Sequence, residues 1–267
     1  LSGTNIKIKT ERETIQQVRI IPKKNEYVIE IVYEKGEENR NLNKANFISI
    51  DIGLNNLATI TSNKINSLIV NGSVLKSVNQ FYNKEKARLQ SFIGDKGTSN
   101  RIINLTNKRN KKVADYLHKA SRYIINQCLI HDIGTIIIGK NANWKQDINI
   151  GKKNNQAFVN IPHDTFIKMI EYKAKLLGIS VILIEESYTS KCSFIDNEPL
   201  TKQVKYLGKR VKRGLFKSAD GIKINADVNG SFNIGRKVIP EFNIIEKGIE
   251  AVVVSPVRIN PYKLKVS

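Results

Sequence analysis

Three acidic positions lie far apart along the chain, each in a setting where a carboxylate is unusual. Asp51 interrupts the apolar run FISIDIG, Glu185 and Glu186 follow the apolar run VILI, and Asp227 lies within INADVNGSFNI. Carboxylate oxygens are the ligands that hard divalent cations such as Mg²⁺ prefer. Two such ions about 3.5–4 Å apart can activate water, orient a phosphate and stabilise a leaving oxygen. If the three segments converge, they predict phosphodiester cleavage.

Each acid also has a purely structural interpretation. Asp51 could cap a turn, Glu185 and Glu186 could be solvent-facing strand ends, and Asp227 could be the N-cap of a helix. Because an isolated acid seldom identifies a site, the metal hypothesis depends on the three segments meeting in the fold.

The elements that must position these acids are typical of an α/β fold. Residues 47–53 and the following NNLATITS predict two strands around a tight Asn/Gly turn. Residues 135–139 (TIIIG) predict a buried strand, residues 162–178 a helix between Pro162 and Gly178, and residues 181–186 (VILIEE) another strand. This order makes a βαβ unit with parallel strands. A last helix is expected at the end of residues 221–238.

Two other regions precede or interrupt this core. Residues 15–34 contain two β-rich runs separated by PKKN, which predicts a hairpin. Within residues 84–130, apolar side chains recur every three or four positions, the period of an amphipathic helix; they are Val113, Leu117, Ala120, Ile124 and Cys128.

The charge balance predicts a polyanionic partner. The 267 residues include 44 Lys and Arg against 24 Asp and Glu, a formal net charge of +20. No apolar run approaches the roughly 18 residues of a membrane-spanning helix, so nucleic acid is favoured over a membrane. The residues that we expect to bind nucleic acid are Lys108, Arg109, Lys111 and Lys112 in the helical region, and Lys209, Arg210, Lys212 and Arg213 in the basic run 201–217.

Sulfur, imidazole and indole side chains give weaker signals. Cys128 and Cys192 form no CxxC pair, so neither a disulfide scaffold nor a local zinc knuckle is indicated, and a reducing cytosol fits. For Trp144 we favour a packing role over base stacking. The histidines show no ligand spacing; they are His118, His131 and His163.

The ordered motifs resemble the TnpB family over about residues 20–240. FISIDIGLNNLATI is similar to the first RuvC motif of that family and NADVNGSFNI to the third. Between them, WKQDINIGKKNNQAFVNIPH and EYKAKLLGISVILIEESYTSKCSF resemble the family's helix and Tyr-Thr-Ser segment. The resemblance implies a ribonuclease H-like (RuvC) mixed sheet with a helical insertion, preceded by a partial β-rich, wedge-like segment.

The same resemblance implies a function and its partners. It implies Mg²⁺-dependent, RNA-guided cleavage of double-stranded DNA in a prokaryotic cytosol, with a two-metal site that could also take Mn²⁺. The guide RNA would come from the end of the transposon. In this class of enzyme, base pairing reads the target sequence while the protein holds the backbone by charge.

The chain departs from the family pattern at the second catalytic acid. Many TnpB proteins place a Glu directly after a strand that resembles TIII, where this chain has Gly139. A branch with this glycine carries an acid before the Tyr-Thr-Ser motif, and Glu186 occupies that place. Because neighbouring strands lie about 4.8 Å apart, Glu186 could reach the same metals. We therefore expect Asp51, Glu186 and Asp227 to be the catalytic metal ligands, with Glu185 on the opposite face.

Two further departures concern zinc and length. Many relatives carry two CxxC pairs before the last Asp, whereas only Cys192 remains here, so no structural zinc is expected and the insert must fold without it. Complete relatives also carry an N-terminal helical region, so the chain is expected to be N-terminally truncated. The expected domains are a partial wedge-like domain (1–45), a nuclease domain (46–240) and a tail (241–267). The nuclease domain contains a helical insertion at about 76–130 and a basic insert at about 190–222.

Two other functions compete with the nuclease. Gly139 leaves open an RNA-guided DNA binder or repressor that no longer cuts, or a decayed fragment, although such a protein would not need Asp51 and Asp227. A strand-transferring transposase with the same acids is the third hypothesis, and the Tyr-Thr-Ser and Asn-Ala-Asp-Val-Asn segments argue against it.

Overall fold

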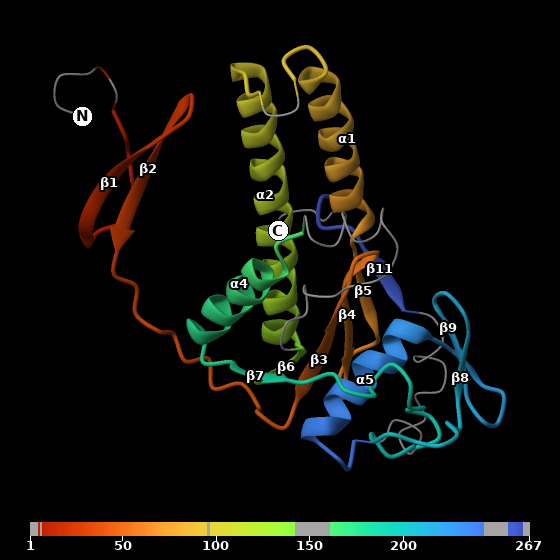
Figure 1. Cartoon of the computed structure of the whole chain (residues 1–267). Helices are drawn as coiled ribbons and strands as arrows, with labels where there is room; N and C mark the ends of the chain where they lie inside the picture. Colours follow the sequence, from red (N-terminus) through yellow and green to blue (C-terminus); the bar gives the residue numbers. More distant parts are fainter. Residues whose placement is uncertain (1–4, 6, 95–96, 142–160, 243–255, 264–267) are drawn as a thin grey trace.

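The computed structural model describes residues 5, 7–94, 97–141, 161–242 and 256–263 (Figure 1). At its centre, strands form a mixed sheet in the order β11-β5-β4-β3-β6-β7. Their bounds are β3 Phe47–Ile52, β4 Asn56–Ser62, β5 Leu68–Asn71, β6 Thr135–Gly139, β7 Ser180–Ile184 and β11 Val257–Ile259. Trp144 and most of the segment WKQDINIGKKNNQAFVNIPH lie outside the described residues.

The pairing of these strands confirms the predicted βαβ unit. β3 pairs with β4 antiparallel and with β6 parallel, and β6 pairs with β7 parallel. The connection from β6 to β7 includes the helix α4 (His163–Lys175), with Gly178 in a left-handed conformation at φ 73° after it. The sequence predicted a strand over residues 181–186, but β7 ends at Ile184. Glu185 and Glu186 therefore lie in the segment after the strand.

The alternation of side chains along β3 assigns a different role to each face of the sheet. Ile48, Ile50 and Ile52 join the larger apolar core, together with residues of α4 and of the long helix α2 (Asn100–Ile130). Phe47, Ser49 and Asp51 alternate with them and face α5 (Ala226–Val238) on the other side (Figure 1). A strand presents successive side chains to opposite faces, so the six residues of β3 contribute to the apolar core on one face and to the α5 contact on the other.

The helical insertion consists of two helices where the sequence predicted one over residues 84–130. α1 spans Ser73–Gln90 and lies beside α2 (Figure 1). The predicted apolar stripe is confirmed, because all five of its residues are buried on α2. The break coincides with Gly94, which adopts φ 80°, and Ser99 then caps α2 by accepting a hydrogen bond from the backbone of Ile102.

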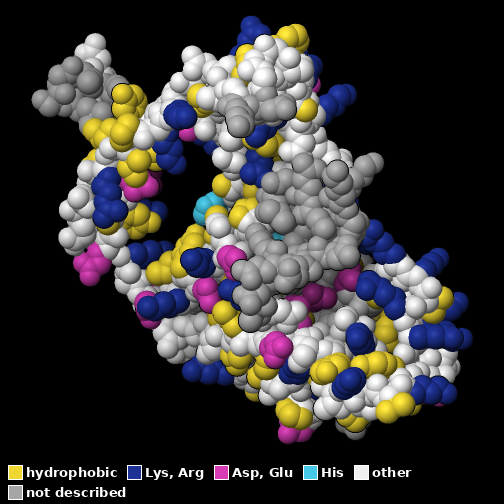
Figure 2. All heavy atoms as spheres, in the orientation of Figure 1, with side chains coloured by type: hydrophobic (Ala, Val, Ile, Leu, Met, Phe, Trp, Pro, Cys, Tyr) yellow, Lys and Arg dark blue, Asp and Glu magenta, His cyan; other side chains and the backbone are white. Residues whose placement is uncertain are grey.

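The predicted N-terminal hairpin is present as β1 (Ile15–Lys23) and β2 (Glu26–Tyr33). Its turn is shorter than expected: Pro22 remains within β1, and Asn25 turns the chain with φ 65°. The hairpin tip leans on α2, where Asn25 Nδ2 donates to Asn100 Oδ1 at 3.2 Å. Elsewhere Figure 2 shows an opening between the hairpin and the body of the molecule.

The C-terminal part contains two features that the sequence did not predict, a small sheet in the basic insert and a strand in the expected tail. The basic insert forms a small antiparallel sheet of β8 (Lys209–Lys212), β9 (Leu215–Lys217) and β10 (Lys223–Asn225), which leads directly into α5. The expected tail contributes the edge strand β11, which the sequence concealed because VRI is only three residues long between two prolines. Among the described residues, no helix combines the length and apolar character that crossing a bilayer requires.

Candidate active site

A cleft of about 460 Å³ opens where the central sheet, α5 and the basic insert meet. Segments far apart in sequence line it: the turn after β3, the start of β4, the β8–β9 loop, the start of α5 and β11. Its charged lining residues are Asp51, Asp227, Arg210, Arg213 and Arg258. Acids at the floor and arginines at the rim suit a polyanion that must approach a cation site.

Asp51 lies on the α5 face of β3, directly under the cleft. Asp51 is partly buried, and this burial raises the pKa of its carboxyl group well above the usual range. The carboxylates of Glu186 and Asp227 raise it further, whereas the Arg210 guanidinium lowers it. Asp51 is therefore close enough to both other acids to interact with their charges, and an additional cation would favour its ionised form.

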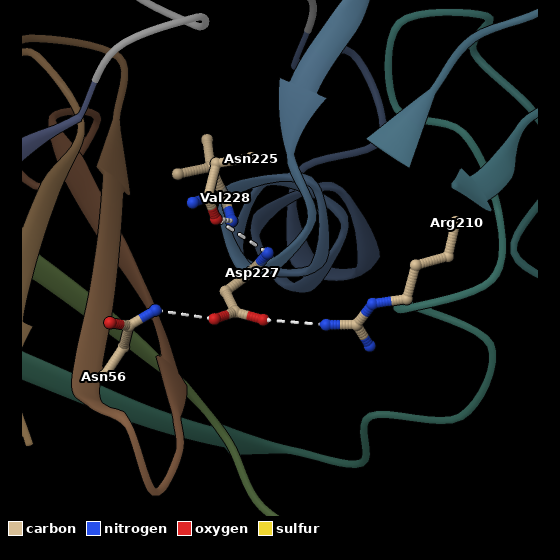
Figure 3. A network of polar contacts seen from close by, with 5 residues as sticks. All are labelled: Asn56, Arg210, Asn225, Asp227 and Val228. Carbon is tan, nitrogen blue, oxygen red and sulfur yellow. Dashed lines mark hydrogen bonds and ion pairs between the residues drawn. The ribbon is translucent and has the colours of Figure 1, made fainter. Parts of the chain in front are cut away.

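Asp227 is held in the first turn of α5 by groups on both sides (Figure 3). Its Oδ2 accepts from Asn56 Nδ2 at 2.6 Å, and its Oδ1 lies 3.4 Å from Arg210 Nη2. The helix N-cap is Asn225, whose side chain accepts from the backbone N–H groups of Asp227 and Val228. The structural interpretation of Asp227 as the N-cap was wrong by two positions, and its side chain is directed toward the cleft.

Glu186 reaches the same region because Gly139 has no side chain. A Cβ added to Gly139 would lie 2.4 Å from Glu186 Oε1 and 2.6 Å from its Cγ. The glutamate thus occupies the space that a side chain at the end of β6 would fill. Asn141 holds it at two points, accepting from Glu186 N at 2.8 Å and donating to Oε2 at 3.2 Å. Burial raises the pKa of Glu186 to about 7, against the opposing effect of Lys237.

A layer of small and polar residues lets α5 approach the sheet closely. A Cβ on Gly230 would lie 3.0 Å from Asp51 Oδ2, and one on Gly235 would lie 2.9 Å from Ser49 Oγ. Ser231 Oγ lies within hydrogen-bond distance of the carbonyl oxygens of Ser49 (2.9 Å) and Thr59 (3.0 Å). The residues of α5 that contact the sheet are small, so the helix lies close to the sheet and places Asp227 near Asp51.

The structure thus places Asp51, Glu186 and Asp227 in the same region of the molecule, on β3, the segment after β7 and α5. Glu185 is exposed, and its carbonyl accepts from Lys237 Nζ at 2.8 Å. Within the described residues, no three Asp, Glu, His or Cys side chains stand close enough to form a closed metal site. The donor chemistry nevertheless fits a hard cation: the ligands are carboxylates, and Glu186 Oε1 is buried without a hydrogen-bond partner among the described residues.

The basic residues predicted to bind nucleic acid fall into two groups. Arg210 and Arg213 line the active-site cleft, and Figure 2 shows Lys and Arg side chains gathered over the insert. Lys108 and Lys112 line a separate groove between α1 and α2. Arg109 in that groove is engaged within the protein, donating to Asn79 Oδ1 at 2.8 Å and lying over the Tyr82 ring. Lys111 pairs with Glu26 of the hairpin.

The basic insert is held by hydrogen bonds around Glu198 and Cys192. Both oxygens of the buried Glu198 accept backbone N–H groups, from Ser193 at 2.7 Å and Leu207 at 2.8 Å. The Cys192 thiol is buried and donates to Pro199 O at 3.3 Å. Three residues of α5 form hydrogen bonds with the same loop: Asn229, Asn233 and Arg236.

Sequence reasoning missed three residues of this region: Asn56, Asn141 and Arg258. Asn56 belongs to the quoted NNLA segment, and Asn141 follows Gly139 by two positions, so their proximity to expected site residues was an available signal. Arg258 gave no signal, because its place depends on the pairing of β11 with β5.

Family models and curated proteins match parts of this chain. Residues 30–145 match the family model described as a probable transposase, OrfB_IS605, and residues 163–234 match that of the Cas12f1-like TNB domain. A TnpB-like protein from Methanocaldococcus jannaschii, MJ0751, is 28% identical over 44% of this chain and 43% of its own length. The TnpB-like protein ORF457 of Acidianus two-tailed virus is 27% identical over 72% of this chain and 41% of its own. The chain spans less than half the length of these curated relatives.

Solved structures share the fold. A Cas12f1 chain, from a complex with sgRNA and target DNA, superimposes with a TM-score of 0.55 at 17% identity over 78% of this chain and 52% of its own length. A chain from a CRISPR-Cas12f ternary complex gives 0.53 at 16% identity, covering 81% and 44%. The expected RuvC-like mixed α/β fold is thereby confirmed. The two family models and the two TnpB-like relatives together support a TnpB-family protein.

Proposed function

We propose that the chain carries the catalytic part of a metal-dependent, RNA-guided DNA endonuclease. The observation that supports this most strongly is that Asp51 and Asp227 line one cleft together with three arginines, and that the charges of Glu186 and Asp227 both act on Asp51. A buried cluster of like charges costs free energy unless a cation compensates for it. Asp51, Glu186 and Asp227 would hold Mg²⁺, or Mn²⁺ in its place, and bound cations would supply the charge that activates water and stabilises the leaving oxygen.

The protein's own groups prepare this site in three ways. β3 fixes Asp51 in a rigid sheet, Gly139 leaves room for the Glu186 side chain, and Asn56 orients Asp227. Arg210 and Arg213 would attract the phosphate backbone toward the carboxylates. Guide RNA and target DNA are the proposed partners, as the complex containing the Cas12f1 chain suggests, and the cytosol is the proposed location.

Programmed plasmid cleavage tests the proposal. The reading frame that contains this chain would be purified with its guide RNA and given a matching plasmid in Mg²⁺. Glu186→Gln and Asp51→Ala should abolish cutting while guide-dependent DNA binding persists, because both carboxylates belong to the proposed metal site. Glu185→Gln is the matched control, since it changes the neighbouring exposed acid. Equal cutting by the wild type and Asp51→Ala would refute the assignment.

A second candidate function is guided DNA binding without cleavage. It is favoured by one observation, that the Arg210 guanidinium already contacts the Asp227 carboxylate, which the nuclease would need as a metal ligand. A wild-type protein that binds its target but leaves it intact in both Mg²⁺ and Mn²⁺ would establish this candidate.

A further inference from the structure

The C-terminal strand β11 lies outside both segments that match the family models, yet it completes the cleft. It pairs in parallel with β5 at the edge of the sheet, so that Arg258 lies opposite Ile69. This register brings an arginine from nearly the end of the chain to the entrance of a site built by residues 51–56 and 227.

Arg258 is joined to Asp227 through one intervening side chain. Its Nη1 donates to Asn56 Oδ1 at 3.2 Å, and Asn56 Nδ2 donates to Asp227 Oδ2 at 2.6 Å. The bond to Arg258 engages the amide oxygen of Asn56, which directs the amide nitrogen toward the carboxylate. Arg258 therefore helps to decide where the Asp227 oxygens lie.

The segment after β11 is fixed to the helical insertion. Tyr262 packs edge-on against Tyr116 of α2, with ring centroids 5.0 Å apart, and its hydroxyl donates to Lys112 O at 3.0 Å. Lys119 Nζ lies 4.9 Å from the centre of the Tyr262 ring. A strand bonded to β5 at one end and packed on α2 at the other can hold an exposed arginine in one position.

We propose that Arg258 is a positioning residue of the cleft, which orients Asp227 through Asn56 and binds a backbone phosphate of the nucleic-acid strand that enters. A guanidinium has five N–H donors in a planar fork that suits phosphate, and the bond to Asn56 uses one of them. Asn56 and Arg210 lie on opposite sides of the Asp227 carboxylate (Figure 3). Arg258 and Arg210 thus approach the acid from two sides, and a strand passing between them would present its phosphate to the carboxylates.

This inference rests on the proposed nuclease function, and its first test is kinetic. Arg258→Ala should lower the single-turnover cleavage rate by about 10- to 100-fold, because small displacements of reacting groups cost this much. Arg258→Lys should recover part of the rate, since it keeps the charge but loses the fork. Lys263→Ala removes an equal charge from the same segment and should cut like the wild type. Arg258→Ala and Asn56→Ala combined should cost less than the product of their separate effects.

A binding measurement separates failure of this inference from failure of the nuclease assignment. Affinity for a single-stranded DNA oligonucleotide would be measured against salt in EDTA, where no cleavage is needed. Arg258→Ala should reduce the slope of log affinity on log salt by about 0.7, the value for one phosphate contact to a single strand, and Lys263→Ala should not. An unchanged slope for Arg258→Ala, or equal losses in both variants, would overturn the inference even if the wild type cuts DNA. A loss restricted to Arg258→Ala would support it even if no variant cuts.

Discussion

The two faces of the central sheet are built from the same strands but differ in chemistry. On the α2–α4 face, side chains such as Ile50, Leu117 and Phe166 form a fully buried apolar core. On the α5 face, the layer next to the sheet contains Ser49, Thr61 and Ser231, which are buried but polar. Adjacent residues of β3 therefore contribute to stability on one side and to the cleft on the other.

This difference shows which face of the sheet can hold a carboxylate whose burial lowers stability. An apolar core loses stability when volume is removed from it, whereas a buried carboxylate lowers stability merely by being ionised. Asp51 on the α5 face lowers the free energy of unfolding in this way, and the apolar core on the other face compensates for the loss. We expect the two faces to respond in opposite ways to substitution.

Adjacent substitutions on β3 provide the strongest test of this contrast. Asp51→Asn should lower cleavage by more than about 100-fold, because losing an outer-shell partner of a metal ligand alone costs about 10- to 100-fold. At pH 8 the same variant should unfold at a higher temperature than the wild type, since it removes a buried charge. Plasmid cleavage and thermal denaturation measure the two effects.

Ile50→Ala is the matched change on the opposite face. It should lower the free energy of unfolding by about 2–5 kcal/mol, because Ile50 is fully buried in the aliphatic core. Its cleavage rate per folded molecule should stay near that of the wild type. If Asp51→Asn destabilised the chain as much as Ile50→Ala, the division between the two faces would be wrong.

The next largest effect should come from Gly139. Gly139→Ala introduces a Cβ where Glu186 Oε1 now lies, and we expect it to reduce cleavage by about 10- to 100-fold by displacing that carboxylate. The double variant Gly139→Glu, Glu186→Gly returns an acid to the end of β6 and should recover part of the lost rate. Failure of the double variant to exceed Gly139→Glu alone would count against a shared position.

Asn141 should have a smaller effect of the same kind. Asn141→Ala removes both contacts to Glu186, and we expect about a tenfold higher Mg²⁺ concentration for half-maximal cleavage, with the maximal rate less affected. A control is Asn110→Ala, which changes an asparagine of α2 remote from the cleft lining. Identical Mg²⁺ titrations for Asn141→Ala and the wild type would remove Asn141 from the site.

The smallest effect concerns pH and the stability of the metal-free protein. Glu186 keeps its proton up to about pH 7 in the folded chain, whereas its ordinary pKa is 4.5. The folded state therefore binds more protons than the unfolded state within this window. Stability should fall as pH rises from about 4.5 to 7, by at most about 1.4 kcal/mol per pH unit. Urea denaturation in EDTA should show a weaker decline for Glu186→Gln than for the wild type.

The sequence predicted those elements whose signals are local. Alternation and apolar runs located β3, β4, β6 and β7, and the spacing of Val113 to Cys128 located the buried face of α2. Asp51 and Glu186 were found because they interrupt or follow such runs, whereas Asp227 was found through its place after the Asn-Ala pair in INADVNGSFNI. Their metal-binding role remains a prediction, although the structure brings them together.

The missing parts depend on contacts between distant segments. β11 has three residues and exists through its pairing with β5, so neither β11 nor Arg258 could be inferred from local pattern. Gly139 was interpreted as a position whose acid is supplied by Glu186 instead, and only the close contact between the two shows why a glycine is needed there. Likewise, the hydrogen bonds of Glu198 that organise the insert join residues whose proximity no spacing rule indicates.

The contact between Gly139 and Glu186 also restricts how this arrangement could have arisen from one with the acid after β6. A chain with glutamate at both positions would place two side chains in one space, and a chain with neither would lack the third carboxylate. Each single step between the two arrangements therefore passes through a strained or an acid-deficient protein. Positions 139 and 186 should therefore change together. A descendant that replaces one of these residues would remain a nuclease only if it also replaced the other.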